Sequence, residues 1–325
     1  MDRRTWLVGS LGLLATPRTT EAQPARVYQL GILNPGPPPG PLAGPSILME
    51  SLAELGYVEG RNLKVERRFA DGRVDRLPAL AADLVQRRVD VIVASASVAV
   101  QAAQEATKTI PIVILIAGAD PVELGLMTSL ARPGGNVTGV VLGAVLAGKR
   151  LELLREAVPR ATRIAMLVPP EVSAGTRLQM QEAEEAAKRL GITLIVVPAP
   201  NRGYEQAFAT MVAERAGALF VSPSPILNGD RARIIALAAR HRLPAIYQWP
   251  DHVREGGLMA YGGNLRGLNR RVAAFVDRIL KGADPATLPV EQATELILAV
   301  NLKTAKTLGL AIPPAVLARA DEVIR

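Results

Sequence analysis

Residues 87–97 read RRVDVIVASAS, and residues 214–224 read ERAGALFVSPS. Each stretch holds an apolar run that follows charged residues and ends in Ser-x-Ser. Such a run is typical of a strand that is buried on both faces of a parallel sheet. Each stretch leads into residues of helical period and then into a proline that opens the next apolar run, at Pro111 and at Pro244. The two halves of the chain are therefore expected to share one α/β architecture.

The same alternation extends to both sides of these stretches. In the first half we expect strands over 27–33, 63–68, 89–94 and 112–116, and helices over 47–55, 76–87 and 98–107. In the second half we expect strands over 163–168, 193–197, 218–221, 245–247 and 258–261, and helices over 150–157, 177–190, 205–214, 230–241 and 268–280. Alternation of this kind predicts the α/β class, with two Rossmann-like lobes built on parallel sheets.

The expected lobe boundaries follow from where the pattern changes. We expect residues 27–140 and about 286–325 to form the first, N-terminal lobe, and residues 141–285 to form the second, C-terminal lobe. A final segment that returns to the first lobe would make the chain cross more than once. A multi-strand hinge of this kind permits the lobes to rotate without unfolding.

Composition excludes several kinds of site. The 325 residues include no cysteine and two histidines, so disulfides, thiolate metal sites and a cysteine nucleophile are excluded. His241 and His252, which we expect on the surface at helix ends, are too few for a histidine zinc site. Residues 143–150 have the glycine and lysine spacing of a phosphate-binding loop, but Arg150 stands where the loop needs Ser or Thr. We therefore expect no catalytic residue, no metal and no cofactor.

Net charge does not indicate a nucleic-acid partner. Lys and Arg number 38 against 30 Asp and Glu, which gives a formal net charge of +8. The basic residues are spread beside acids along the expected helices, as in residues 182–189, and such mixed runs are typical of solvated helix faces. A DNA-binding protein would concentrate positive charge on one element.

Residues 1–22 have the pattern of an export signal. Arg3 and Arg4 precede an apolar run over 6–15, and Ala22 ends a polar stretch. The apolar run is too short to span a bilayer, and no later segment reaches the roughly 18 apolar residues that a span needs. Both the general and the twin-arginine export routes accept such an N-terminus, so the route and the cleavage site stay open. We expect a mature protein that is soluble outside the cytoplasm.

Candidate ligand-binding residues follow the expected strands, because ligands of open parallel sheets bind beyond the carboxyl ends of the strands. They are Asn34, Ser95, Ser97 and Asp120 in the first half, and Glu171, Ser222, Ser224, Tyr247, Trp249 and Tyr261 in the second. The serines and Asp120 also suit helix caps. The three aromatic residues fall within a short stretch and suit either a pocket wall or a core patch beneath the helix over 268–280.

Seven segments carry a family resemblance. They are GYVEGRN (56–62), RLPALAADLV (76–85), DPVELGL (120–126), RPGGNVTG (132–139), KRLELL (149–154), NLKTAKTLGL (301–310) and LARADEVI (317–324). Together they resemble the ABC transporter substrate-binding protein family that includes the tryptophan-binding, TrpX-type proteins.

The resemblance implies a type I periplasmic-binding-protein fold, with two lobes joined by three crossings and a small ligand between them. It also implies an ABC permease and ATPase as partners. The export signal and the absence of a cysteine that could carry a lipid predict a periplasmic protein without a lipid anchor, and we expect a monomer. Characterised members favour aromatic amino acids. For such a ligand we expect Ser95 and Ser97 to hold the carboxylate, Asp120 or Glu171 the ammonium group, and the three aromatic residues the side chain.

The functional hypothesis is capture of a small molecule by closure of two lobes, with no chemistry performed on it. One alternative is a sensor that presents its closed form to a receptor. Further alternatives are a cytoplasmic repressor-like ligand-binding core, which would need a DNA-binding helix pair at the N-terminus, and an α/β enzyme, for which no residues of suitable spacing stand out.

Overall fold

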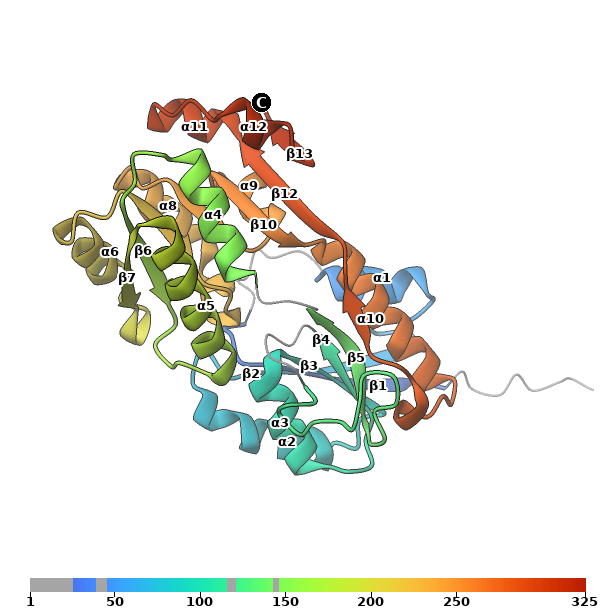
Figure 1. Ribbon diagram of the computed structural model, residues 1–325. Coiled ribbons are helices and arrows are strands. Elements are labelled where there is room, and N and C mark those ends of the chain that lie inside the picture. Colours follow the sequence, from blue (N-terminus) through green and yellow to red (C-terminus); the bar gives the residue numbers. More distant parts are fainter. Residues whose placement is uncertain (1–25, 39–45, 116–120, 143–145) are drawn as a thin grey trace, which may run out of the picture.

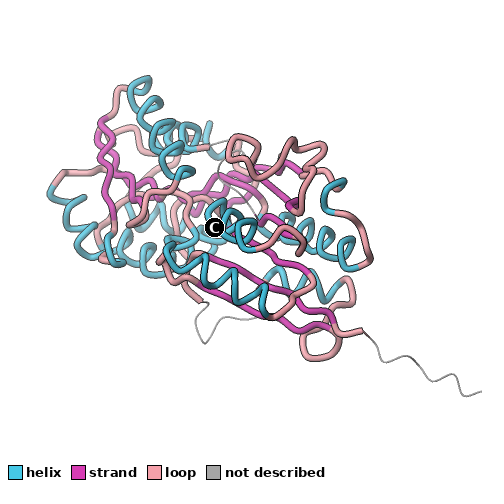
Figure 2. The backbone as a smooth tube through the Cα atoms, turned by 90° about the horizontal axis from the view of Figure 1, so that it is seen from below, coloured by secondary structure: helices cyan, strands magenta, loops and turns pink. Residues whose placement is uncertain are grey.

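The computed structural model describes residues 26–38, 46–115, 121–142 and 146–325, and it shows two α/β lobes (Figure 1). Helices flank the strands of both lobes, both in Figure 1 and in the turned view of Figure 2. The predicted fold class, two Rossmann-like lobes with mainly parallel sheets, is confirmed. The predicted export signal at residues 1–22 lies outside the described residues.

The first lobe has a parallel sheet that is covered on both faces. Its strands are β1 (Tyr28–Asn34), β2 (Leu63–Phe69), β3 (Val91–Ser95), β4 (Ile112–Leu115), β5 (Val137–Leu142) and β11 (Glu291–Ala293). They lie in the order β11-β5-β4-β3-β1-β2. Its helices are α1 (Ile47–Glu54), α2 (Leu77–Gln86), α3 (Ala96–Ala106) and α10 (Leu265–Leu280), with 3₁₀ turns at Val74–Arg76 and Pro285–Thr287. α1 and α10 pack on one face, and α2 and α3 on the other.

The second lobe repeats this plan. Its strands are β6 (Arg163–Val168), β7 (Thr193–Pro198), β8 (Ala218–Val221), β9 (Ala245–Tyr247), β10 (Met259–Gly263), β12 (Leu296–Asn301) and β13 (Glu322–Ile324), in the order β13-β12-β10-β9-β8-β6-β7. Its helices are α4 (Ala147–Ala157), α5 (Ala174–Leu190), α6 (Tyr204–Ala213), α7 (Pro225–Gly229), α8 (Arg231–Arg240), α9 (Pro250–Arg254), α11 (Leu302–Leu308) and α12 (Pro314–Leu317), with a 3₁₀ turn at Pro200–Arg202. All pairs are parallel except β10 with β12.

The two sheets share one strand order. The first five strands of each lobe run β2-β1-β3-β4-β5 and β7-β6-β8-β9-β10, which is a doubly wound arrangement. β3 and β8, which correspond in this order, are the two stretches that end in Ser-x-Ser. All five residues of β3 are buried, as expected for a central strand of a parallel sheet. The predicted similarity of the two halves is therefore a similarity of topology.

The lobes exchange helices, and this corrects the predicted boundaries. The chain crosses between β5 and α4, between β10 and α10, and between β11 and β12. α10 packs on the sheet of the first lobe, although we expected residues 141–285 to lie in the second lobe. β12 and β13 join the sheet of the second lobe, although we expected residues 286–325 in the first. Sequence pattern shows that α10 is amphipathic but not which sheet its apolar face covers.

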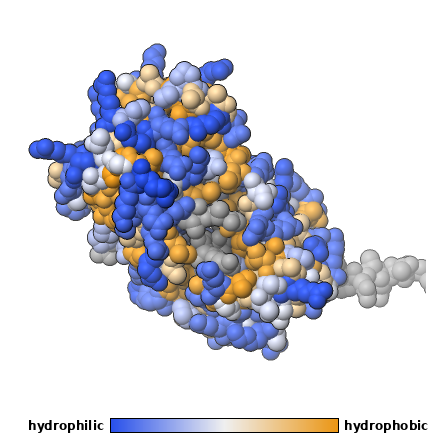
Figure 3. Space-filling view, in the orientation of Figure 1, coloured by the Kyte–Doolittle hydropathy of each residue, from blue (hydrophilic) through white to orange (hydrophobic). Residues whose placement is uncertain are grey.

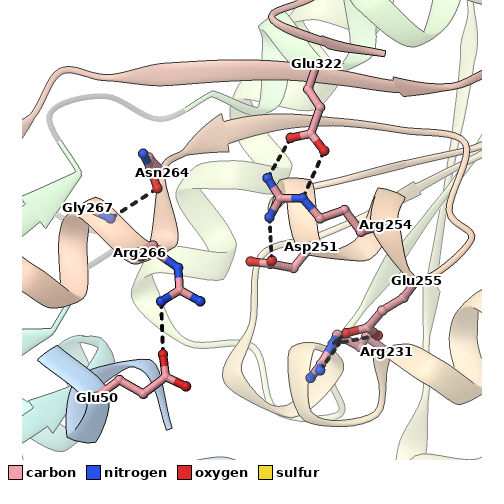
Figure 4. A network of polar contacts seen from close by, with 9 residues as sticks. All are labelled: Glu50, Arg231, Asp251, Arg254, Glu255, Asn264, Arg266, Gly267 and Glu322. Atoms are coloured by element: carbon pink, nitrogen blue, oxygen red, sulfur yellow. Dashed lines mark hydrogen bonds and ion pairs between the residues drawn. The ribbon is translucent and has the colours of Figure 1, made fainter. Parts of the chain in front are cut away.

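The hinge is well packed where the crossings meet. Asn264 ends the second crossing, and its side chain accepts a hydrogen bond from the Gly267 N–H at 3.1 Å, which caps α10 (Figure 4). Trp249 of the second lobe belongs to the same apolar cluster as Leu268 of α10.

Within the described ranges, no helix is long and apolar enough to cross a bilayer.

Candidate functional site

A cleft of about 890 Å³ lies between the lobes. Its lining comes from the carboxyl ends of strands in both sheets and from the first turns of α3 and α5. Most of the lining is apolar and includes Ile32, Val93, Leu115, Leu142 and Leu265. In Figure 3 hydrophobic residues gather where the two lobes meet. A mostly apolar cleft with a few polar groups is typical of a small-molecule site.

Asn34, Ser95 and Ser97 line the first-lobe side of the cleft. Asn34 donates from Nδ2 to the Ser95 hydroxyl at 3.4 Å and accepts the Gly36 N–H at 2.7 Å. Ser95 stands at the N-cap position of α3, but its side chain makes no capping bond. Between the serines, Ala96 has a φ of 64°, a left-handed conformation that costs a non-glycine residue about 1 kcal/mol. This strained residue stands at the start of α3, whose first turn lines the cleft.

Glu171 and Ser224 line the second-lobe side. The side chain of Glu171 is exposed, whereas the Ser224 hydroxyl accepts the Ile226 N–H at 3.2 Å and caps α7. Ser173 caps α5 in the same way by accepting the Thr176 N–H at 3.2 Å, and the first turn of α5 lines the cleft. Asp120, the other expected partner of an ammonium group, lies outside the described residues.

The expected aromatic wall reduces to Trp249. Trp249 lines the cleft, but Tyr247 and Tyr261 do not. Tyr247 is 1% exposed, packs in the core of the second lobe and lies 5.2 Å from the His252 ring between centroids. Tyr261 packs against a different core cluster of the same lobe. Because Tyr247 pairs with Ala260, the side chains of Tyr247 and Tyr261 lie on opposite faces of the sheet, and neither of their clusters contains α10. The interpretation of a core patch beneath this helix is therefore wrong for the two tyrosines, and Trp249 alone shares a cluster with the helix.

Ser222 also faces away from the cleft, into a small cavity of about 10 Å³ beneath it. Ser222, Tyr247 and His252 all line this cavity. In the described part of the chain, the two hydroxyls and Nδ1 of His252 have no hydrogen-bond partner. The volume is roughly that of one water molecule, which needs two to four polar partners. Ser222 and Tyr247 therefore line this small cavity and not the cleft.

His252 is buried, and the expectation of a surface position is wrong. The side chain is 4% exposed, and Nε2 lies 3.0 Å from Oδ1 of Asn228. Burial, with a smaller contribution from the nearby positive charge of Arg231, lowers the pKa of His252 to about 3. The imidazole is therefore neutral in the folded protein at neutral pH.

Sequence reasoning missed Arg150 and Gln179, which both line the cleft. Arg150 is 2% exposed and donates from Nε to the Tyr261 carbonyl at 2.7 Å. Its position carries a signal that went unused, because it falls on the apolar stripe of α4 with Ala147, Leu151 and Leu154. An arginine on such a stripe is expected to be buried, and a buried cation is unfavourable unless an acid or a ligand pairs with it.

Two other cleft arginines are neutralised. Arg67 donates to both carboxylate oxygens of Glu59, at 2.7 and 2.6 Å. Arg231 makes a similar paired contact with Glu255, at 2.8 and 2.9 Å (Figure 4). Both pairs are partly exposed, so the charges of Arg67 and Arg231 are already balanced and in contact with solvent.

Comparison with known proteins agrees with this geometry. Residues 40–324 match the family model described as ABC transporter substrate binding protein. The chain belongs to this family. Its predicted resemblance to the family is therefore confirmed, and members of the family bind a small solute for an ABC transporter.

Three relatives of this substrate-binding family are informative. The chain is 26% identical over 263 residues to a tyrosine-binding protein of Clostridioides difficile, a match that covers 81% of this chain and 75% of the relative. A conserved domain protein of Vibrio cholerae is 27% identical, covers 92% of this chain and 100% of its own, and superposes with a TM-score of 0.79. A domain of Streptococcus pneumoniae in complex with L-Trp is 24% identical with the same coverage and a TM-score of 0.77.

The first prediction separates Trp249 from Tyr247. Trp249→Phe should weaken binding of a solute in the cleft about five- to tenfold, because it reduces a contact surface there. Tyr247→Phe should change the dissociation constant less than about twofold, since that ring lies outside the cleft. Calorimetric titration measures both. Equal losses in the two variants would contradict this assignment of the aromatic residues.

The second prediction concerns stability against pH. The unfolded state binds a proton at His252 below about pH 6.5, whereas the folded state does so only below about pH 3. This group therefore lowers the free energy of unfolding as pH falls from about 6.5 toward 3, by at most about 1.4 kcal/mol per pH unit. Urea denaturation of the protein and of His252→Gln at several pH values measures the difference. Parallel pH profiles would refute the role of His252.

Proposed function

We propose that this protein is the extracytoplasmic solute-binding component of an ABC uptake system and that it captures an amino acid with an aromatic side chain. The observation that carries the proposal is the large, mostly apolar cleft, lined from both lobes at the strand ends. The relatives whose descriptions name tyrosine and L-Trp support the choice of ligand. The protein binds and releases this ligand without chemical change.

The proposal includes a location and partners. Residues 1–22 carry the pattern of an export signal, which supports a periplasmic protein. The partners are an ABC permease and its ATPase, which the family description supports. The protein acts as a monomer in this scheme, since one chain supplies both walls of the cleft.

Binding works through the two lobes. Ser95 and Ser97, with the N–H groups at the start of α3, present hydrogen-bond donors from the first lobe. Glu171 from the second lobe takes the ammonium group, and Trp249 covers part of the side chain. A ligand that contacts both lobes stabilises the closed form by the contacts that only this form makes.

Contacts across the rim show how closely the lobes approach. A Cβ atom on Gly36 would lie 2.8 Å from the Pro225 carbonyl oxygen, and one on Gly229 would lie 2.5 Å from the Pro37 ring. Each of these pairs joins the first lobe to α7 of the second. The glycines therefore permit an approach that any larger residue would prevent.

One ion pair bridges the lobes. Arg202 donates from Nη1 to Oδ1 of Asp71 at 3.2 Å. The arginine is oriented from its own lobe, because its Nε donates to Asp230 at 2.6 Å and Asp230 also accepts the Tyr204 hydroxyl at 2.7 Å. Arg202 and Asp71 both have a left-handed backbone, with φ values of 59° and 53°. Two turns of unusual conformation thus place the partners opposite each other.

The third prediction tests capture by closure. Titration with L-tyrosine, L-tryptophan and L-phenylalanine should give saturable binding by calorimetry, and X-ray scattering should show a smaller radius of gyration at saturation. An unchanged scattering profile with a saturating ligand would contradict closure. If none of the three binds and native mass spectrometry finds a different solute bound, the aromatic ligand is wrong and capture stands.

The fourth prediction tests the ion pair between lobes. Asp71→Asn removes the charge and keeps a residue that tolerates the left-handed backbone. The pair is half-exposed, so its loss should weaken ligand binding no more than about fivefold, mainly through faster dissociation. Stopped-flow displacement measures the rate. Asp75→Asn is the matched control, because Asp75 pairs with Arg73 inside the first lobe, and an equal effect there would refute the bridge.

A further inference from the structure

Arg150 is a buried cation that forms no ion pair with any acid of the described residues. It lies on α4 after the first crossing, lines the cleft and is 2% exposed. Its one hydrogen bond among the described residues joins Nε to the Tyr261 carbonyl at 2.7 Å. No carboxylate of the described chain lies within ion-pair distance of its guanidinium. The terminal nitrogens, which are the paired donors of the arginine fork, are thus left without a protein partner.

Burial makes this arrangement unfavourable without a ligand. Removal from water lowers the pKa of Arg150 to about 10, and the charge of Glu182 only partly offsets the effect. Glu182 already accepts the Ala147 N–H at 3.0 Å at the start of α4. Buried charges in proteins are paired as a rule, because an isolated one loses its hydration. The missing partner is therefore expected to come from outside the chain.

The backbone around Arg150 holds it in place. A Cβ atom on Gly262 would overlap the Gln248 carbonyl oxygen and would lie 3.4 Å from Nη2 of Arg150. The absence of a side chain at Gly262 thus allows β9 and β10 to approach and lets the guanidinium lie beside β10. Because its anchor at Tyr261 is a backbone carbonyl, the orientation of the arginine does not depend on another mobile side chain.

The charges in the cleft favour an anion. Arg67 and Arg231 are paired with glutamates, which leaves Arg150 and Arg177 as cleft arginines without an acid, against Glu171 as the one acid in the described lining. The positive ends of the α3 and α5 dipoles line the same cleft. Gln179 adds an acceptor, because its Oε1 is buried and has no partner within the described segments, while the residue is 7% exposed.

We propose that Arg150 is the anion-binding residue of the second lobe and that the ligand carries a carboxylate, which the guanidinium binds through its two terminal nitrogens. The planar fork of arginine matches the two oxygens of a carboxylate. Gln179 accepts an N–H of the same ligand. This inference rests on the proposed function and changes one part of it: Arg150, and not Ser95 and Ser97, holds the carboxylate. The two serines then contact the ligand from the first lobe.

The test compares molecules that differ in one group. L-Phenylalanine and 3-phenylpropanoate carry the carboxylate, and phenethylamine lacks it. The wild-type protein should bind the two carboxylates and should bind phenethylamine at least about 100-fold more weakly. Arg150→Met should weaken both carboxylates about 100-fold and leave phenethylamine unchanged, while Arg150→Lys, which keeps the charge without the fork, should lose about tenfold.

Stability separates a binding role from a structural one. If Arg150 serves the ligand, Arg150→Met should keep the melting temperature of the ligand-free protein within a few degrees or raise it, because a buried charge is removed. A structural arginine would give a clear fall in all variants, Arg150→Lys included. Arg163→Met is the control: Arg163 belongs to the same lobe, bonds Glu214 and lies outside the cleft lining, so ligand affinity should not change.

The outcomes distinguish this inference from the proposed function. If the wild-type protein binds 3-phenylpropanoate and Arg150→Met binds it equally well, Arg150 is not the carboxylate-binding residue, while the proposed capture of a solute stands. Binding of phenethylamine as tight as that of phenylalanine does the same. If the wild-type protein binds no carboxylate but binds a neutral solute such as myo-inositol, the role of Arg150 in binding a carboxylate is refuted, while the proposed capture of a solute stands. Failure of carboxylates and neutral solutes alike overturns both.

Discussion

The architecture depends on the need to cover both faces of each parallel sheet. A parallel sheet with one open face exposes a continuous apolar surface, so helices must pack on both of its faces. Here the helices that follow β5 and β10 pack on the sheet of the opposite lobe: α4 covers the second sheet and α10 covers the first. Neither lobe can bury its core without a segment from beyond the hinge. The lobes are therefore bound to each other by their own folding.

This exchange also brings recognition and hinge together. Arg150 lies in α4, just after the first crossing, and its hydrogen bond goes to Tyr261, just before the second. Trp249 packs with Leu268 at the start of α10 and lines the cleft as well. A ligand held at these residues touches the segments about which the lobes turn. Binding energy gained there acts on lobe orientation directly, without a chain of intermediate contacts.

Periodicity predicted most of the fold, and its failures have physical causes. The strands and helices of both halves lie close to their expected bounds, because buried parallel strands and amphipathic helices leave strong patterns. The exchange of α10 and of β12 was not predictable, since an apolar helix face fits either sheet. Domain assignment therefore failed where the chain crosses, although the number of crossings that the family resemblance implied, three, agrees with the structure.

The site was harder to predict than the fold. Strand ends located Asn34, Ser95, Ser97, Glu171, Ser224 and Trp249 at the cleft, because topology fixes where parallel strands end. Tyr247 and Tyr261 were misplaced because clustering in sequence does not tell which face of a strand a side chain takes. Arg150 was missed because its charge was counted with the solvated helix faces, and only its place on an apolar stripe would have set it apart.

Magnitudes indicate what controls closure. The Asp71–Arg202 pair is half-exposed, and such pairs contribute roughly 0.2–1 kcal/mol. That is at most about a fivefold bias, so the rim pair alone cannot hold the lobes together. Leaving a buried charge without its partner costs about 2–5 kcal/mol, which is enough to change an equilibrium between two forms by roughly 1.5 to 3.5 orders of magnitude. An anion bound at Arg150, as we propose, would therefore contribute more to closure than the rim pair does.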